Sequence, residues 1–297
     1  MNAPSSVRRG GYEPYGSVRR GSATRWRVFA RYQLEVAWQT WWRYRLALLI
    51  AVMVTATFAG LMYFLSDSSM FRGFRRLGGG ELAIADGVLP ASIQWYRRAA
   101  FVLSLTVTAG SISGDRESGA FALYIARSTR PVDYLAGKLV AIVGMTAILT
   151  LAGPVLLAVL RLGLFEDTSS LMSHLWLVPA MVVTGALSTL TYALVPLACS
   201  ALFATRRRAV SVWVGYWLLA GSVFALLGTM TSGWISAFDL ASALDSVTYQ
   251  LFDLHLVRRL QMPWEVAVAS IALHVVAAIW IVWYRIHAAY QPGVPGS

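Results

Sequence analysis

The densest group of ionisable side chains in this sequence is a polar island, residues 114–138, that interrupts a largely apolar chain. Charged residues alternate there with apolar ones, and Pro131 prevents a single long helix from running through the island. The pattern fits a short amphipathic element that lies on a membrane surface and offers a contact to a cytosolic partner. The candidate contact residues are Asp115, Arg116, Glu117, Gly119, Phe121, Tyr124, Arg127, Arg130 and Pro131.

Within the island, we expect Asp115 and Glu117 to make charged contacts that fix the element, and Gly119 to allow close packing. Each residue also has a plainer interpretation. The carboxylates would then be solvated charges at the membrane edge, and the glycine an ordinary turn residue. Gly110 and Gly114 likewise fit either a close approach of two helices or chance.

A second group of acids, Asp239, Asp245 and Asp253, falls in one segment together with His255. Carboxylates and imidazole are the usual side chains of acid–base catalysis, and near a membrane surface they would suit a lipid-modifying enzyme. Their spacings of 6, 8 and 2 residues match no acid–base or metal-binding pattern. A lipid-modifying enzyme is therefore an alternative, and we expect no catalytic residues in this chain.

The remaining reactive residue types indicate no further site. The single cysteine, Cys199, excludes an intrachain disulfide. Of the histidines, only His274 falls inside a predicted membrane span, where an ionisable residue is a functional hypothesis by default. The spans carry no central acid of the kind a proton-coupled carrier needs. The four histidines, which show no metal-ligand spacing, are His174, His255, His274 and His287.

No nucleotide-binding motif is present in this sequence. The Gly137-Lys138 pair is followed by Leu139, and Val132 stands where a P-loop would need glycine. We therefore expect no cofactor in this chain, and any ATP hydrolysis must take place on another subunit.

Composition indicates a bilayer protein. The 297 residues are 57% hydrophobic and 13% charged, with a mean hydropathy of +0.59. Apolar runs reach the roughly 20 residues that cross about 30 Å of hydrocarbon. The net charge of +11 is explained by basic residues that flank spans and contact anionic membrane lipids, so no nucleic-acid partner is expected.

The chain is predicted to be an all-α integral membrane protein with six transmembrane helices. A flexible basic tail covers residues 1–24, an interfacial amphipathic helix residues 25–45, the membrane domain residues 46–284, and a C-terminal tail residues 285–297. The second span is the shortest, and Arg97 and Arg98 are expected to snorkel at its end. The predicted spans are Leu46–Leu65, Ala91 or Ala99 to Ser113, Leu139–Leu160, Leu175–Ala198, Val210–Met230 and Trp264–Tyr284.

Basic residues set the expected orientation. With the N-terminus inside, the inner connections and tails carry 17 Lys and Arg residues and the outer connections carry eight. Both termini are therefore predicted to be cytoplasmic, and the difference comes from residues 1–45. The outer connection 231–263 has apolar residues at helical spacing, which predicts an outer-face helix that ends at Pro263.

The polar island resembles a known family, the type-2 ABC exporter permeases. Asp115–Gly119 is similar to that family's acidic-x-Glu-x-Gly signature after the second span, although the family commonly carries Glu at the first position. Arg130–Val132 and Tyr134–Lys138 are similar to the motifs that continue it. A small-residue-rich fourth span leading into three arginines, within Ala186–Ala209, is a second similarity.

The resemblance implies that the island forms a cytoplasmic coupling helix between helices 2 and 3, which docks on a separate ABC ATPase subunit. That ATPase would bind ATP and Mg, and a second permease chain, most simply a homodimer, would complete the path. The resemblance also implies an exporter in the cell membrane, with a bacterial inner membrane as the expected location. A lipid-modifying enzyme and a stand-alone carrier or channel are the alternatives, and the sparse polar residues of the spans are compatible with lipid-like cargo.

Overall fold

The computed structural model describes residues 24–39, 44–67, 81–126, 130–164, 168–230, 235–254 and 262–290. All regular structure in these ranges is helical, which confirms the all-α prediction. Five helices among them are long and apolar enough to cross a membrane, as expected for a multi-pass membrane protein. The candidate spans are Tyr44–Leu65, Pro131–Gly163, Thr168–Leu202, Arg206–Gly228 and Trp264–Ala289.

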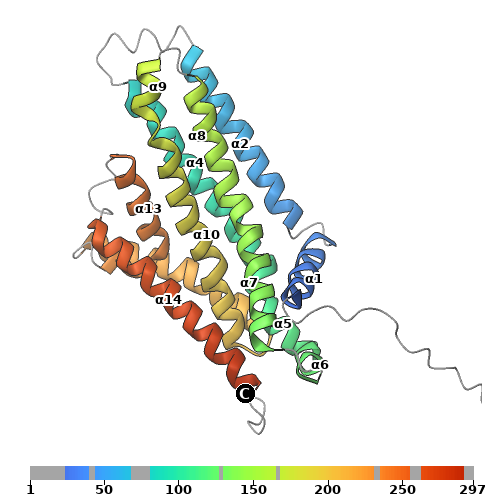
Figure 1. Cartoon of the computed structure of the whole chain (residues 1–297). Helices are drawn as coiled ribbons and strands as arrows, with labels where there is room; N and C mark the ends of the chain where they lie inside the picture. Colours follow the sequence, from blue (N-terminus) through green and yellow to red (C-terminus); the bar gives the residue numbers. More distant parts are fainter. Residues whose placement is uncertain are drawn as a thin grey trace, which may run out of the picture.

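The described residues of the first part of the chain form two short helices, α1 and α6, and three long helical runs (Figure 1). Helix α1 confirms the predicted helix in residues 25–45 up to Gln39; residues 40–43 lie outside the described ranges, and Tyr44 and Arg45 belong to the next helix. The elements are α1 (Trp26–Gln39), α2 (Tyr44–Asp67), α4 (Glu81–Leu103), the π-helix η2 (Ser104–Thr108), α5 (Ser111–Glu117), α6 (Ala120–Ala126), α7 (Pro131–Ala147), the π-helix η3 (Ile148–Ala152) and α8 (Gly153–Gly163).

The second half of the chain adds the most buried of the five candidate spans, which contains α10, and the long oblique helix α14 (Figure 1). The elements are α9 (Thr168–His174), α10 (Leu177–Leu202), α11 (Arg206–Gly215), the π-helix η4 (Tyr216–Ala220), α12 (Gly221–Met230), the 3-10 helix η5 (Ile235–Phe238), α13 (Leu240–Leu251) and α14 (Trp264–Ala289).

Close helix packing in the centre of the bundle depends on two glycines. A Cβ at Gly153 would lie 2.4 Å from the Tyr96 ring, and one at Gly185 would lie 2.5 Å from the Thr150 carbonyl oxygen. The π-helix η3 precedes Pro154, which has no N–H to continue the helical ladder. These features let α8 pack on α4, and α10 on η3, at short range.

The predicted second span is part of a longer helical run in the structure. Helices α4, η2 and α5 follow one another from Glu81 to Glu117, with a turn only at Ala109 and Gly110. This run is not among the five candidate spans. Two adjacent arginines, Arg97 and Arg98, lie within α4 rather than at a span end. Their charge lowers the mean hydropathy of the run.

The helix predicted in the connection 231–263 is present, but its end was predicted wrongly. Helix α13 covers Leu240–Leu251, and the Asp239 carboxylate caps its first turn by accepting hydrogen bonds from the backbone N–H groups of Ala241 and Ser242. Pro263 does not end this helix; it is the residue before α14. Its fixed φ suits the start of a helix as well as a stop, and the sequence does not distinguish these two roles.

Candidate functional site

The polar island folds into three helices at the end of the bundle that also holds the C-terminus of α14 (Figure 1). Helix α7 begins at Pro131, which confirms that proline interrupts the island. Gly119 joins α5 to α6 with φ +73°, a conformation that side chains other than glycine rarely adopt. A Cβ at Gly119 would meet no atom within 4 Å. Within this chain its role is therefore that of a turn residue, and close packing of Gly119 against a docking partner stays a prediction.

Asp115 is a buried anchor of the island. Its carboxylate accepts a 2.8 Å hydrogen bond from the Tyr134 hydroxyl and pairs with the Lys138 ammonium at 3.0 Å. Lys138 also donates to the Gln33 side-chain oxygen at 2.7 Å and to the Ser111 carbonyl at 3.1 Å. Because these residues come from α1, α5 and α7, the ion pair and its hydrogen bonds hold three helices together.

Helix α1 fits closely against α7 beside this ion pair. A Cβ at Gly137 would lie 2.5 Å from both the Trp26 carbonyl oxygen and the Phe29 Cβ. The Phe29 ring packs edge-on against Tyr124 and Tyr134, with ring centroids 5.2 and 5.5 Å apart. Burial raises the pKa of Tyr124 to about 12, so its phenol stays neutral at physiological pH. The amphipathic helix is thus packed against the island through aromatic contacts.

Arg116 and Glu117 fasten the end of α5 to other helices. The Arg116 guanidinium donates to the Ala201 carbonyl oxygen at 2.9 Å, near the C-terminus of α10. The Glu117 carboxylate accepts a 2.9 Å hydrogen bond from the backbone N–H of Arg206, the first residue of α11. The predicted charged contacts are therefore made within the chain, where they position the island.

The exposed described residues of the island include two large apolar side chains. Leu123 on α6 has 63% of its surface exposed, and Val132 on α7 has 49%. Arg130 is exposed as well, whereas Phe121 is buried and Tyr124 half-buried. The candidate residue Arg127 lies outside the described ranges. Leu123 was not among the candidate contact residues, although its position two residues after the buried Phe121 is compatible with the opposite helix face.

The two glycines four residues apart have different surroundings. A Cβ at Gly110 would lie 2.6 Å from the side chain of Arg206, which also donates to the Thr106 carbonyl oxygen in η2. A Cβ at Gly114 would meet nothing within 4 Å. Gly110 thus makes room for an arginine, and the pair does not form a close helix crossing within this chain.

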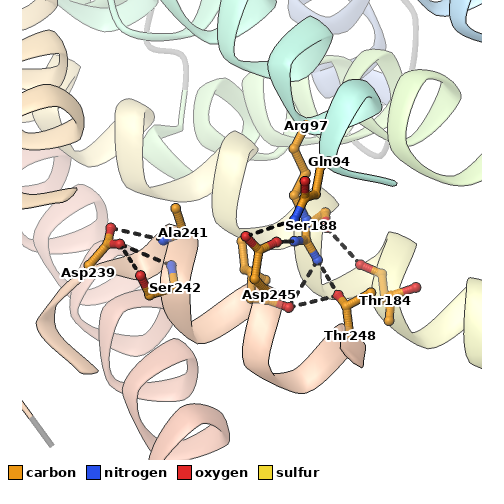
Figure 2. A network of polar contacts seen from close by, with 10 residues as sticks. Gln94, Arg97, Thr184, Ser188, Asp239, Ala241, Ser242, Asp245 and Thr248 are labelled. Carbon is orange, nitrogen blue, oxygen red and sulfur yellow. Dashed lines mark hydrogen bonds and ion pairs between the residues drawn. The ribbon is translucent and has the colours of Figure 1, made fainter. Parts of the chain in front are cut away.

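A second ion pair, which sequence reasoning missed, joins α4, α10 and α13 (Figure 2). Arg97 is only 4% exposed, and its Nη1 lies 2.5 Å from Asp245 Oδ1. The other Asp245 oxygen accepts a 3.2 Å hydrogen bond from Gln94. The expectation that Arg97 snorkels was wrong, because Asp245 compensates its charge inside the bundle. Arg98 stays on the outside of α4, over the Trp95 ring.

Hydroxyl and carbonyl groups complete the coordination of Arg97. Its Nε donates to Ser188 Oγ at 2.9 Å, and its Nη2 donates to Thr248 Oγ1 at 2.5 Å and to the Leu244 carbonyl oxygen at 3.1 Å. The guanidinium thus has a partner at each nitrogen (Figure 2). This arrangement is a satisfied structural network rather than an acid–base centre.

The three acids Asp239, Asp245 and Asp253 have different surroundings. Asp239 caps α13, Asp245 pairs with Arg97, and Asp253 follows α13 with φ +52°. His255 lies outside the described ranges. Across the described ranges, no three His, Cys, Asp or Glu residues lie close enough to hold a metal ion.

His274, the histidine predicted inside a span, has partners on both ring nitrogens. Its Nε2 lies 3.1 Å from the Tyr216 hydroxyl, and its Nδ1 lies 2.8 Å from the Ser270 carbonyl oxygen. It also borders a cavity of about 430 Å³ with mainly apolar walls. The bond to Tyr216 joins η4 to α14, and the bond to Ser270 lies within α14, so the imidazole has a structural role.

Comparison of the sequence with family models and with curated proteins finds no match. The function of this chain must therefore be inferred from its own residues and their geometry.

Proposed function

We propose that this chain is the membrane-spanning permease subunit of an ATP-binding cassette exporter that uses ATP hydrolysed on a separate ATPase subunit. The observation that carries the proposal is the island itself. The short helix α6 exposes an apolar side chain, Leu123, at one end of the bundle. The preceding helix α5 is held to α7 by an ion pair and to α10 and α11 by hydrogen bonds. Lys138, the cation of that ion pair, also binds α1. A surface helix held in this way can transmit a movement of a cytosolic partner to the membrane spans.

The docking contact would be made by the exposed apolar side chains Leu123 of α6 and Val132 of α7, and by the exposed Arg130, which precedes α7. Apolar side chains surrounded by polar ones are typical of the central contacts of protein interfaces. Asp115, Arg116 and Glu117 would have a different role, because their side chains bind groups of this chain. In this proposal they position the coupling helix and do not contact the ATPase.

We count the run from Glu81 to Glu117 as a sixth span. An arginine facing lipid would be costly there, but Arg97 is paired with Asp245 inside the bundle, which lowers that cost. Helix α1 would then lie in the cytoplasmic headgroup layer, since its exposed face mixes Arg27 and Arg31 with Trp38. Both termini would be cytoplasmic, in the cell membrane, and a second permease chain would complete the transport path.

The test is recovery of an ABC ATPase with the detergent-solubilised chain from its native host. We expect Leu123→Asp to lower that recovery by about tenfold, the effect of losing one buried apolar contact. Met172→Asp is the matched control, because Met172 is 68% exposed on α9 and lies outside the island. Both variants must reach wild-type abundance in the membrane.

Two results would contradict the proposal. The first is the absence of any ABC ATPase from the wild-type complex under several gentle detergents. The second is transport by liposomes that contain this chain alone and no ATP, which would indicate a stand-alone carrier. Unchanged recovery with Leu123→Asp would leave an ATPase partner possible but remove α6 as its docking site.

A further inference from the structure

We propose that Arg97 and Asp245 form a latch that holds helix α13 in the bundle, and that α13 moves away from α4 and α10 only when this ion pair breaks. The proposal concerns α13 and is independent of the ATPase partner. Its structural basis is the ion pair between Arg97 of α4 and Asp245 of α13, together with the hydrogen bond from Arg97 to Ser188 of α10 (Figure 2).

The latch lies at a depth where charged side chains are energetically unfavourable. Ser188, which accepts a hydrogen bond from Arg97, lies near the middle of α10, so the guanidinium is at the depth of a span centre. Arg97 is 4% exposed, and the Asp245 side chain is 30% exposed. The pKa of Asp245 is raised, because burial raises it by more than the neighbouring Arg97 lowers it. Charges at such a depth are tolerated only while they are paired.

The rest of the contact between α13 and the bundle is apolar packing. On the buried face of α13, Leu240, Ala243, Leu244 and Val247 lie in one buried cluster with Tyr192 of α10 and Trp213 of α11. Apolar packing is non-directional, so the ion pair and its hydrogen bonds are the directional contacts that hold α13 against α4.

A buried ion pair is suited to a two-state device. Its net contribution to stability is small because desolvation offsets the attraction, but removing one partner leaves an uncompensated charge and strongly favours the open arrangement. The surrounding hydroxyls do not depend on Arg97 alone. Ser188 also donates to the Thr184 carbonyl oxygen, and Thr248 donates to that of Leu244. Replacing both charges by apolar side chains would thus leave these hydroxyls bonded.

The test uses thiol accessibility, which the single native cysteine makes simple. Cys199→Ala removes that thiol, and Ser246→Cys places a near-isosteric thiol on the buried face of α13. The full chain is reconstituted in nanodiscs, and the rate of labelling by N-ethylmaleimide is measured. We expect slow labelling in this background, and labelling about tenfold faster or more after Asp245→Asn. The double variant Arg97→Met with Asp245→Leu is expected to restore slow labelling.

A control thiol separates release of α13 from loss of the fold. Thr146→Cys in the Cys199→Ala background reports on α7, where Thr146 is 1% exposed. Asp245→Asn should leave its labelling rate unchanged. Equal acceleration at positions 146 and 246 would overturn the proposal, because the pair would then hold the whole bundle. No acceleration at position 246, or fast labelling there in the double variant, would overturn it as well.

Discussion

Two buried ion pairs in this molecule differ in how they are built. The Asp115–Lys138 pair joins α5 to α7 through two residues that are 23 positions apart in the sequence, and Lys138 also binds Gln33 of α1. The Arg97–Asp245 pair connects positions 148 residues apart and ties α13 to the centre of the bundle. Both pairs also have neutral partners: Tyr134 and Gln33 bind the first, and Gln94, Ser188 and Thr248 bind the second. They differ in exposure, since the Asp245 side chain is 30% exposed and that of Asp115 is 12% exposed. The Asp115–Lys138 pair is suited to a permanent joint between helices, and the Arg97–Asp245 pair to a switch that opens and closes.

The largest effect that this comparison predicts is that of Asp245→Leu. It leaves Arg97 buried without its counter-charge, and we expect a loss of about 3–5 kcal/mol of stability. Thermal unfolding in detergent measures the loss. The double variant with Arg97→Met should recover most of it, and a double variant as unstable as the single one would contradict the view that an unpaired charge is the cause.

Lys138→Met is expected to cost less, about 2–3 kcal/mol. Asp115 then loses its ion-pair partner but still accepts the hydrogen bond from Tyr134. Thermal unfolding under the same conditions gives the comparison directly. A loss as large as that of Asp245→Leu would show that both pairs are equally dependent on their charges, and the distinction between joint and switch would fail.

Gly137→Ala tests the joint through packing rather than charge. The added methyl would meet the backbone of α1 at 2.5 Å, so α1 must move away from α7. We expect a cost of about 1–3 kcal/mol and easier proteolysis within α1. Gly144→Ala on the same helix is the control, because a Cβ there meets nothing within 4 Å. Equal behaviour of the two variants would show that α1 is not held by this contact.

The smallest predicted effect is that of Glu117→Ala. It removes the acceptor for the Arg206 backbone N–H at the start of α11, and because Glu117 is exposed we expect a loss of only about 0.5–1 kcal/mol. Glu117→Gln keeps an acceptor and should fall between wild type and Glu117→Ala. If Glu117→Ala lowered ATPase recovery as much as Leu123→Asp without changing stability, Glu117 would be a contact residue and not a positioning one.

Local pattern was enough to predict several elements. The amphipathic spacing of residues 25–45 predicted the helix α1, and Pro131 predicted the break that separates α6 from α7. These features depend on backbone chemistry and on neighbours within one or two turns. The buried Gln33 on α1 could not be predicted in this way, because its reason is Lys138 on another helix.

Arg97 and Arg98 show what the local sequence pattern cannot predict. They are adjacent, of the same type and in the same helix, yet one is buried against Asp245 and the other lies over an exposed tryptophan. A rotation of about 100° per residue separates their directions on α4. Which direction points inward depends on where α10 and α13 pack, and no short stretch of sequence contains that information.

The sequence by itself determined the apolar helices, the polar island between them and the residue types available for charged contacts. Tertiary structure alone decided that Asp115, Arg116 and Glu117 bind within the chain, that Leu123 is exposed, and that Arg97 is compensated. The physical reason is that composition and periodicity act over a few residues of the backbone, whereas burial and charge pairing depend on partners that the fold brings together from distant segments.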